Sequence, residues 1–103
     1  MYLGAPAKPF PETVVVRLRD LVQTISGVFE AHIPQCYAPG VMKDPSQILV
    51  VITREGADMA AILTELEEKL HEFLPNRATL DVWPLGLQSD MVQAVRRANC
   101  PLL

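Results

Sequence analysis

The sequence has 103 residues, of which 50% are hydrophobic and 20% are charged. This length fits one compact domain over residues 1-103, and the apolar content argues against a disordered tail. Nine basic and twelve acidic side chains give a formal net charge of -3. The chain therefore lacks the basic footprint of a protein that binds nucleic acid or an anionic membrane surface.

The chain ends and the cysteines indicate the cellular compartment. The first six residues lack the basic and apolar regions of a secretory signal, and the longest apolar run, Ile48 to Ile52, is too short for a membrane span. Cys36 and Cys100 form no C-x-x-C motif, which favours two reduced thiols over the alternative of a structural disulfide. We expect a cytoplasmic protein.

The N-terminal segment predicts a short strand followed by a helix. Residues 2-5 are a weak first strand, because glycine and proline interrupt them. Pro11 suits the first helical turn, and Gly27 is the expected stop. Between them, apolar residues recur at steps of three and four and give one face of an amphipathic helix: Val14, Leu18, Leu21, Val22 and Ile25.

Two strands joined by a loop are expected next. Residues 28-37 alternate, with Phe29, Ala31 and Ile33 on one face and Glu30 and His32 on the other. Pro34 favours an edge position or a bulge in this strand. Residues 39-46 are rich in turn formers, and residues 47-54 then form a strand that is apolar on both faces, as a central buried strand is.

The C-terminal half predicts a helix, a strand and a last short helix. Residues 58-74 form the longest helix, with Asp58 as its N-cap and Pro75-Asn76 at its end. Its apolar stripe consists of Met59, Ile62, Leu63, Leu66, Leu70 and Phe73. Residues 78-84 form a strand and residues 89-98 a helix. The order (β)αββαβ plus a short C-terminal helix predicts an α+β, ferredoxin-like split βαβ sandwich.

Two sets of side chains invite a catalytic or metal-binding interpretation, and both are explained more simply. Glu30, His32 and Cys36 resemble a nucleophile with its base and orienting carboxylate, but four residues of strand span about 13 Å, too far for a thiol-imidazole hydrogen bond. His71 has Glu67 and Glu68 one turn back, which is typical of helical side-chain pairing.

The remaining charged groups and motifs point to no reaction. The acidic group of the long helix is interpreted as a solvated face: Glu65, Glu67, Glu68 and Glu72. Arg96-Arg97 complement the negative end of the last helix. The sequence has no phosphate-binding glycine motif and no G-x-S-x-G motif. We therefore expect no catalytic residue, no metal and no cofactor.

The second face of the sheet is the predicted contact surface. Two helices can cover one face, whereas the other would carry Trp83 beside Ile48, Val50 and Ile52. An uncovered apolar strip usually marks a contact with a partner. We predict that a second copy of the chain or a sister domain covers it. The alternative is that the last helix folds back over this face through Met91, Val92 and Val95.

The spacing of these elements resembles the C-terminal domain of the SseB family, the enhanced serine sensitivity proteins. The resemblance covers nearly the whole chain and is carried by Leu3-Gly4-x-Pro6, Pro11, Val28-x-x-Ala31-x-Ile33, Ile48-Leu49-Val50-Val51-Ile52, Leu63, Leu74-Pro75 and Leu80-Asp81-Val82. It implies a bacterial protein whose family has no established molecular activity and no catalytic residue to transfer. The sequence differs from two-domain members in lacking their N-terminal domain, as either a stand-alone version or a domain cut from a longer chain would, and in ending Asn99-Cys100-Pro101-Leu102-Leu103.

Three functions are compatible with these observations. The first is a non-catalytic protein-interaction module that acts as a homodimer or with a partner protein. The second is a small-molecule sensing domain for an amino acid or another metabolite. The third is an enzyme with Cys36 or Cys100 as a reactive thiol.

Overall fold

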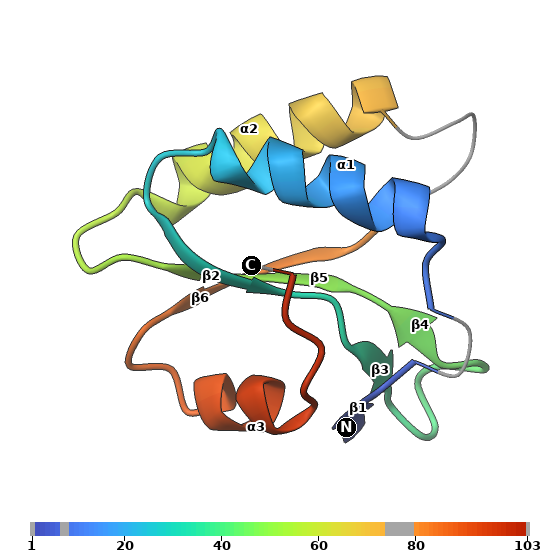
Figure 1. Cartoon of the computed structure of the whole chain (residues 1–103). Coiled ribbons are helices and arrows are strands. Elements are labelled where there is room, and N and C mark those ends of the chain that lie inside the picture. Colours follow the sequence, from blue (N-terminus) through green and yellow to red (C-terminus); the bar gives the residue numbers. More distant parts are fainter. Residues whose placement is uncertain (1, 7–8, 74–79, 103) are drawn as a thin grey trace.

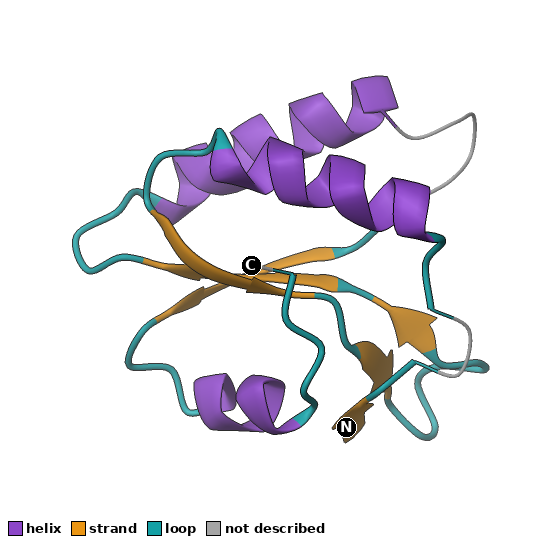
Figure 2. Cartoon of the chain, viewed as in Figure 1, coloured by secondary structure: helices purple, strands orange, loops and turns teal. Residues whose placement is uncertain are grey.

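The computed structural model of the chain describes residues 2-6, 9-73 and 80-102. These residues form three layers (Figures 1 and 2). Helices α1 (Glu12–Gln23) and α2 (Met59–Phe73) lie over one face of a sheet, and helix α3 (Met91–Arg97) lies over the other. The expected α+β class is confirmed. Within the described part of the chain, no helix is both long and apolar enough to cross a membrane.

The central sheet contains β2 (Val28–His32), β5 (Leu49–Thr53) and β6 (Val82–Gly86), in the order β2-β5-β6. Strands β2 and β5 are antiparallel, whereas β5 and β6 are parallel and connected through α2. Every residue of β5 is buried. The prediction of a central strand that is apolar on both faces is confirmed.

A second, smaller sheet continues from the antiparallel pair of β2 and β5, which are the two arms of one hairpin. It contains β1 (Tyr2–Gly4), β3 (Gln35–Tyr37) and β4 (Ser46–Gln47), in the order β1-β3-β4. The chain leaves β2 at Ile33 and Pro34 and leaves β4 at Ile48. Proline has no N–H to donate to a strand partner, but the Pro34 carbonyl accepts a hydrogen bond from the Ile48 N–H at 2.9 Å. The strand interruption expected at Pro34 therefore divides the hairpin between two sheets, with β2 and β5 in the central sheet and β3 and β4 in the small one.

The strand pairing differs from the ferredoxin-like prediction. In a split βαβ unit another strand separates the two strands that the helix connects, whereas here β5 pairs directly with β6. Strand β1 pairs only with β3, at the edge of the small sheet. A three-residue strand with an exposed Tyr2 cannot fill the centre of a sheet whose other strands have five residues. The predicted order of elements is right, and the predicted split arrangement is wrong.

The main core lies between the central sheet and the two long helices. Leu49 and Val51 of β5 point to this side and meet Leu66 and Leu70 of α2. The other buried members of this cluster are Leu18, Val22, Ile25, Ala31, Ile33, Ile62 and Leu102. The predicted stripes of both helices are thus confirmed in their central turns. The prediction for the Phe73 side chain and for residues 74-76 lies outside the described residues.

The C-terminal segment closes the β2 edge of the central sheet. After α3, Asn99 adopts a φ of 54°, a left-handed conformation that asparagine tolerates and that turns the chain back. The Ile33 N–H then donates to the Cys100 carbonyl at 2.9 Å, and the Leu102 N–H donates to the Ala31 carbonyl at 2.8 Å. Leu102 is buried in the main core. These bonds tie α3 to the sheet at its C-terminal end.

Candidate functional site

The predicted contact face is covered from within the chain. Ile48, Val50 and Ile52 are fully buried. Val95 of α3 packs in one cluster with Ile48 and Val50, together with Cys36. Figure 1 shows α3 beneath this face of the sheet. The assignment of Ile48, Val50 and Ile52 to an exposed interaction surface is corrected, because all three are buried and the last helix folds back over Ile48 and Val50, as the alternative prediction had it.

Trp83 is partly exposed and packs against the edge of this second cluster. Strand β6, which carries it, ends the central sheet, but its free edge is poorly suited to strand addition. The Leu49 N–H donates to the Asp81 carbonyl, so the backbone N–H and C=O groups of Asp81 point toward β5. Backbone groups alternate in direction along a strand, so those of Trp83 also point toward β5. Pro84, the next residue, therefore faces the edge and offers no N–H there.

The Glu30, His32 and Cys36 side chains do not form a catalytic group. Glu30 instead joins β2 to α3: its carboxylate accepts a hydrogen bond from Arg96 Nε at 3.2 Å, pairs with Arg96 Nη2, and contacts His32 Nε2 at 3.0 Å. Arg96, followed by His32, holds the pKa of Glu30 below its ordinary value despite the opposing effect of burial. Glu30, His32 and Arg96 thus fasten the last helix to the sheet.

Neither cysteine has the properties of an activated nucleophile. Both thiols are free. Cys36 is buried on β3 in the second cluster, on the far side of the Pro34 break from His32. Burial raises the pKa of the Cys36 thiol and also that of Cys100, the opposite of the depression that reactive cysteines need. The geometry therefore gives no support to a thiol-based reaction.

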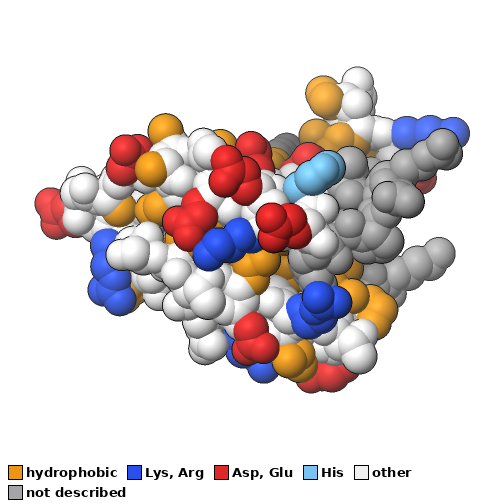
Figure 3. All heavy atoms as spheres, turned by 90° about the horizontal axis from the view of Figure 1, so that it is seen from above, with side chains coloured by type: hydrophobic (Ala, Val, Ile, Leu, Met, Phe, Trp, Pro, Cys, Tyr) orange, Lys and Arg blue, Asp and Glu red, His pale blue; other side chains and the backbone are white. Residues whose placement is uncertain are grey.

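The acidic group on α2 lies on its outer, exposed face, as predicted. Figure 3 looks onto this side of the molecule and shows several acidic side chains beside one histidine. Glu65 pairs with Lys69 one turn later at 3.0 Å. A shallow open depression is lined by Glu67, Glu68, His71 and Glu72. Among the described residues, no group of three or more histidine, cysteine or acidic side chains is arranged to hold a metal ion.

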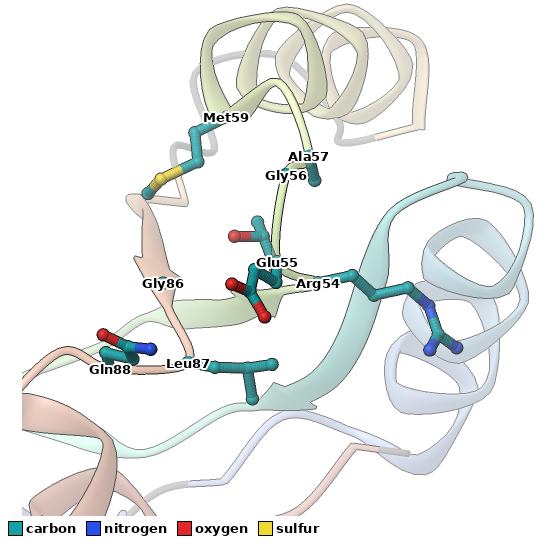
Figure 4. A pocket seen from close by; sticks show the side chains of 9 residues that line it. Arg54, Glu55, Gly56, Ala57, Met59, Gly86, Leu87 and Gln88 are labelled. Carbon is teal, nitrogen blue, oxygen red and sulfur yellow. The ribbon is translucent and has the colours of Figure 1, made fainter.

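A more enclosed hollow than the depression on α2 lies at the carboxyl ends of the parallel strands β5 and β6, beside the start of α2 (Figure 4). Its volume is about 280 Å³. The lining comes from the turn after β5, the first turn of α2 and the turn after β6: Thr53, Arg54, Glu55, Gly56, Ala57, Met59, Gly86, Leu87 and Gln88. We call it the strand-end pocket.

Local sequence explains why this space stays open. Gly56 has a φ of 79°, a left-handed conformation that glycine adopts without strain, and it turns the chain from β5 toward α2. Asp58 then caps the helix, as predicted, with its Oδ1 accepting from the Ala61 N–H at 3.1 Å. Gly86 ends β6, and a Cβ placed there would meet no atom within 4 Å. Two glycines thus keep side chains out of the pocket.

Two apolar residues at this site depart from the sequence-based expectation. Met59 was predicted to face the core, but it sits in the first turn of α2, is 36% exposed and lines the pocket. Phe29 was predicted to share a face with Ala31, but a register shift between Val28 and Glu30 displaces it, and it is 46% exposed. The Arg54 guanidinium lies over its ring, 5.5 Å from the centroid.

The sequence pattern did not reveal the strand-end pocket, because the segment between the predicted strand 47-54 and the predicted helix 58-74 carries no motif of its own. The available signal was the combination of a buried apolar strand, a glycine turn and a helix that returns to a parallel strand. Ligands of open α/β sheets bind outside the carboxyl ends of such strands. The prediction of a split βαβ unit hid this signal, because it placed β6 away from β5.

In comparisons of the chain with known proteins, no family model, no curated protein and no solved structure matches it.

Proposed function

We propose that this chain is a non-catalytic small-molecule-binding domain whose ligand occupies the strand-end pocket. The observation that carries the proposal is the position of the pocket, at the carboxyl ends of two directly paired parallel strands. Binding sites of α/β sheets recur at this place, because the strand ends, the following turns and the start of the connecting helix converge there.

The composition of the pocket lining supports the same proposal. Ala57, Met59 and Leu87 supply apolar walls, and Glu55 and Gln88 supply a few polar groups. Apolar walls with a few polar groups are typical of small-molecule sites. Both cysteines lie on other elements, so we propose binding without chemical conversion. This is the sensing function that the sequence left as its second hypothesis.

A fragment titration followed by ¹H–¹⁵N correlation spectra tests the proposal. A library of small polar and apolar compounds at millimolar concentration should contain compounds that shift the amide signals of residues 53-59 and 86-88. Signals from β1 and β3, in the other sheet, should stay in place. The proposal is contradicted if the spectrum is that of a folded protein and no compound moves the pocket signals.

Protein contact is the second candidate, and a specific surface favours it. Leu3, Met42 and Trp83 pack against the second cluster, and Tyr2 and Val41, the chain neighbours of Leu3 and Met42, are 68% and 86% exposed. Exposed apolar side chains beside this cluster suit a second copy of the chain or a sister domain, the partners that the apolar pattern of the sheet predicted. The partner would be a cytoplasmic protein.

Light scattering between about 10 and 300 μM tests this second candidate. If a dimer forms through this surface, Trp83→Ala should lower the apparent mass at a given concentration while the helix signal in circular dichroism persists. A wild-type chain that stays monomeric throughout that range argues against homodimerisation. A sister domain would then have to be sought as a separate protein.

A further inference from the structure

We propose that the ligand of the strand-end pocket is a small organic cation, a primary ammonium group on a short hydrocarbon stem. This inference rests on the proposed function and adds the charge and shape of the ligand. It follows from the side chains that point into the pocket, from the one that points away, and from the cap of the adjoining helix.

A carboxylate without a partner lies in the pocket. Glu55 projects into the space between Met59 on one side and Leu87 and Gln88 on the other (Figure 4). Glu55 makes no hydrogen bond or ion pair with any of the described residues, in contrast to Glu30 and Glu65. Glu55 is exposed, so water solvates its carboxylate in the free protein, and a cationic ligand in the pocket could pair with it.

The basic residue of the pocket lining is directed elsewhere. The Arg54 side chain extends away from the other lining side chains in Figure 4. Its guanidinium rests over the exposed face of Phe29, at 5.5 Å from the ring centroid, where cation–π attraction holds it. The bulge that displaces Phe29 from the core places the ring there. Arg54 therefore does not neutralise Glu55.

The helix start does not favour an anion either. A helix N-terminus ordinarily attracts negative ligands through its unpaired N–H groups and its dipole. At α2 the Asp58 carboxylate already accepts the Ala61 N–H at 3.1 Å. A bound anion would lie beside the Glu55 carboxylate, and Asp58, between the lining residues Ala57 and Met59 in the chain, adds a second negative charge to this segment, so like charges repel an anion. The electrostatics of the site thus oppose the anion expected at such a position.

The walls determine the rest of the ligand. Met59 and Leu87 are 36% and 38% exposed and flank the space from α2 and from the turn after β6. Apolar surface of this kind gains from covering a hydrocarbon stem. The Gln88 side-chain carbonyl is a second acceptor for an ammonium N–H. A pocket of about 280 Å³ has room for a small ligand with such a stem.

A matched set of probes tests the charge directly. n-Butylammonium and n-butanol share a four-carbon stem and differ in charge, and butyrate carries the opposite charge on a stem one carbon shorter. Each is titrated at neutral pH against the folded full chain by ¹H–¹⁵N spectra. We expect n-butylammonium to shift residues 53-59 and 86-88 with a millimolar affinity, as suits so small a ligand. Butyrate and n-butanol should bind at least about threefold more weakly, and added salt should weaken only n-butylammonium.

Glu55→Gln removes the charge and keeps the shape, and it should lower the n-butylammonium affinity at least about threefold while n-butanol binding is unchanged. Glu67→Gln, on the exposed outer face of α2, is the matched control and should bind as the wild type does. Equal affinity for all three probes, or an unchanged affinity in Glu55→Gln, overturns the assignment of a cation.

The two proposals fail in different ways. If uncharged or anionic compounds of the fragment library shift the pocket signals and n-butylammonium shows no preference, the strand-end pocket is a ligand site but not a cation site. If neither the library nor the three probes shift these signals, the proposed function fails as well.

Discussion

Val95→Ala tests whether the last helix supplies the missing cover of the sheet. Val95 is 0% exposed and packs against Cys36, Ile48 and Val50. The substitution removes two methyl groups, worth about 0.8 kcal/mol each, and leaves a cavity that adds to the loss. Alanine returns up to about 0.7 kcal/mol through its higher helix propensity. The free energy of unfolding should fall by about 1.5 to 2.5 kcal/mol.

The matched control is Val16→Ala, the same chemical change on α1 at a position that is 41% exposed. It should stay within about 0.5 kcal/mol of the wild type. Urea unfolding followed by circular dichroism reports the helices, and the fluorescence of Trp83, the single tryptophan, reports the second cluster. In thermal unfolding, Val95→Ala should lower Tm by roughly 6 to 20 °C.

Equal stability of the two variants would refute the placement of α3 beneath the sheet. It would favour a second copy of the chain over Ile48 and Val50, and the unfolding midpoint would then rise with protein concentration. A concentration-independent midpoint, together with the loss at Val95 alone, is the result that the fold predicts.

Three further perturbations have defined outcomes. Leu66→Ala, at a fully buried position of the main core, should lower the free energy of unfolding in urea by about 2 to 5 kcal/mol. His71→Ala, on the exposed face of α2, should change it by no more than about 0.5 kcal/mol. Equal losses in the two variants would contradict the assigned faces of α2. The Arg96 guanidinium lowers the pKa of Glu30, so this carboxylate stabilises the folded protein above the ordinary glutamate pKa, and this stabilisation is lost as the pH falls through the lowered pKa of the folded state. The free energy of unfolding, measured from pH 7 to pH 3, should therefore decline less steeply in Glu30→Gln than in the wild type. Parallel curves for the two proteins would contradict the ion pair. Because burial raises the pKa of both cysteine thiols, the folded protein should react with iodoacetamide at pH 7 more slowly than the urea-unfolded chain, and equally fast alkylation would revive a reactive-thiol function.

Local signals in the sequence predicted most of the elements. The apolar step from Leu18 to Val22 predicted the buried face of α1, and Ile25, just after this helix, is buried as well. The run from Ile48 to Ile52 predicted the strand that is buried on both faces. Asp58 predicted the helix cap that the structure contains. These features are fixed by neighbours in the sequence, so a pattern of residue types suffices to find them.

Which strands lie side by side in each sheet could not be predicted from such local patterns. The pairing of β5 with β6, and of β1 with β3, depends on contacts between segments far apart in the chain. The bulge at Phe29 and the return of Leu102 to the β2 edge also depend on such contacts. A residue pattern specifies which face of a sheet is apolar, but not which of several apolar elements covers that face. The sequence alone therefore did not distinguish α3 from a partner chain as the cover of the second face.

The strand-end pocket depends on the pairing of β5 with β6 and therefore could not be predicted from the sequence. Glu55 and Gln88 are separated by the whole of α2, and only the parallel register, in which Thr53 pairs with Gly86, brings their turns together. Once that register is known, the proposal of a ligand site at the Glu55-Gly56 turn follows from the position of this turn at the strand ends.

The most direct test of the strand-end pocket is to fill it and measure ligand binding. Gly86 lines the pocket in a strand conformation, and a Cβ there meets no atom within 4 Å, so Gly86→Ile should fold and place its side chain in the ligand space. Gly4→Ile is the matched control, because Gly4 is also a strand glycine with no atom within 4 Å of a Cβ but lies in the other sheet.

The measurement is the affinity, by ¹H–¹⁵N spectra, of the best-binding fragment for the wild type and for both variants. If the strand-end pocket is the functional site, Gly86→Ile loses at least about tenfold in affinity and Gly4→Ile binds as the wild type does. Unchanged binding by a folded Gly86→Ile would contradict it and place the ligand elsewhere.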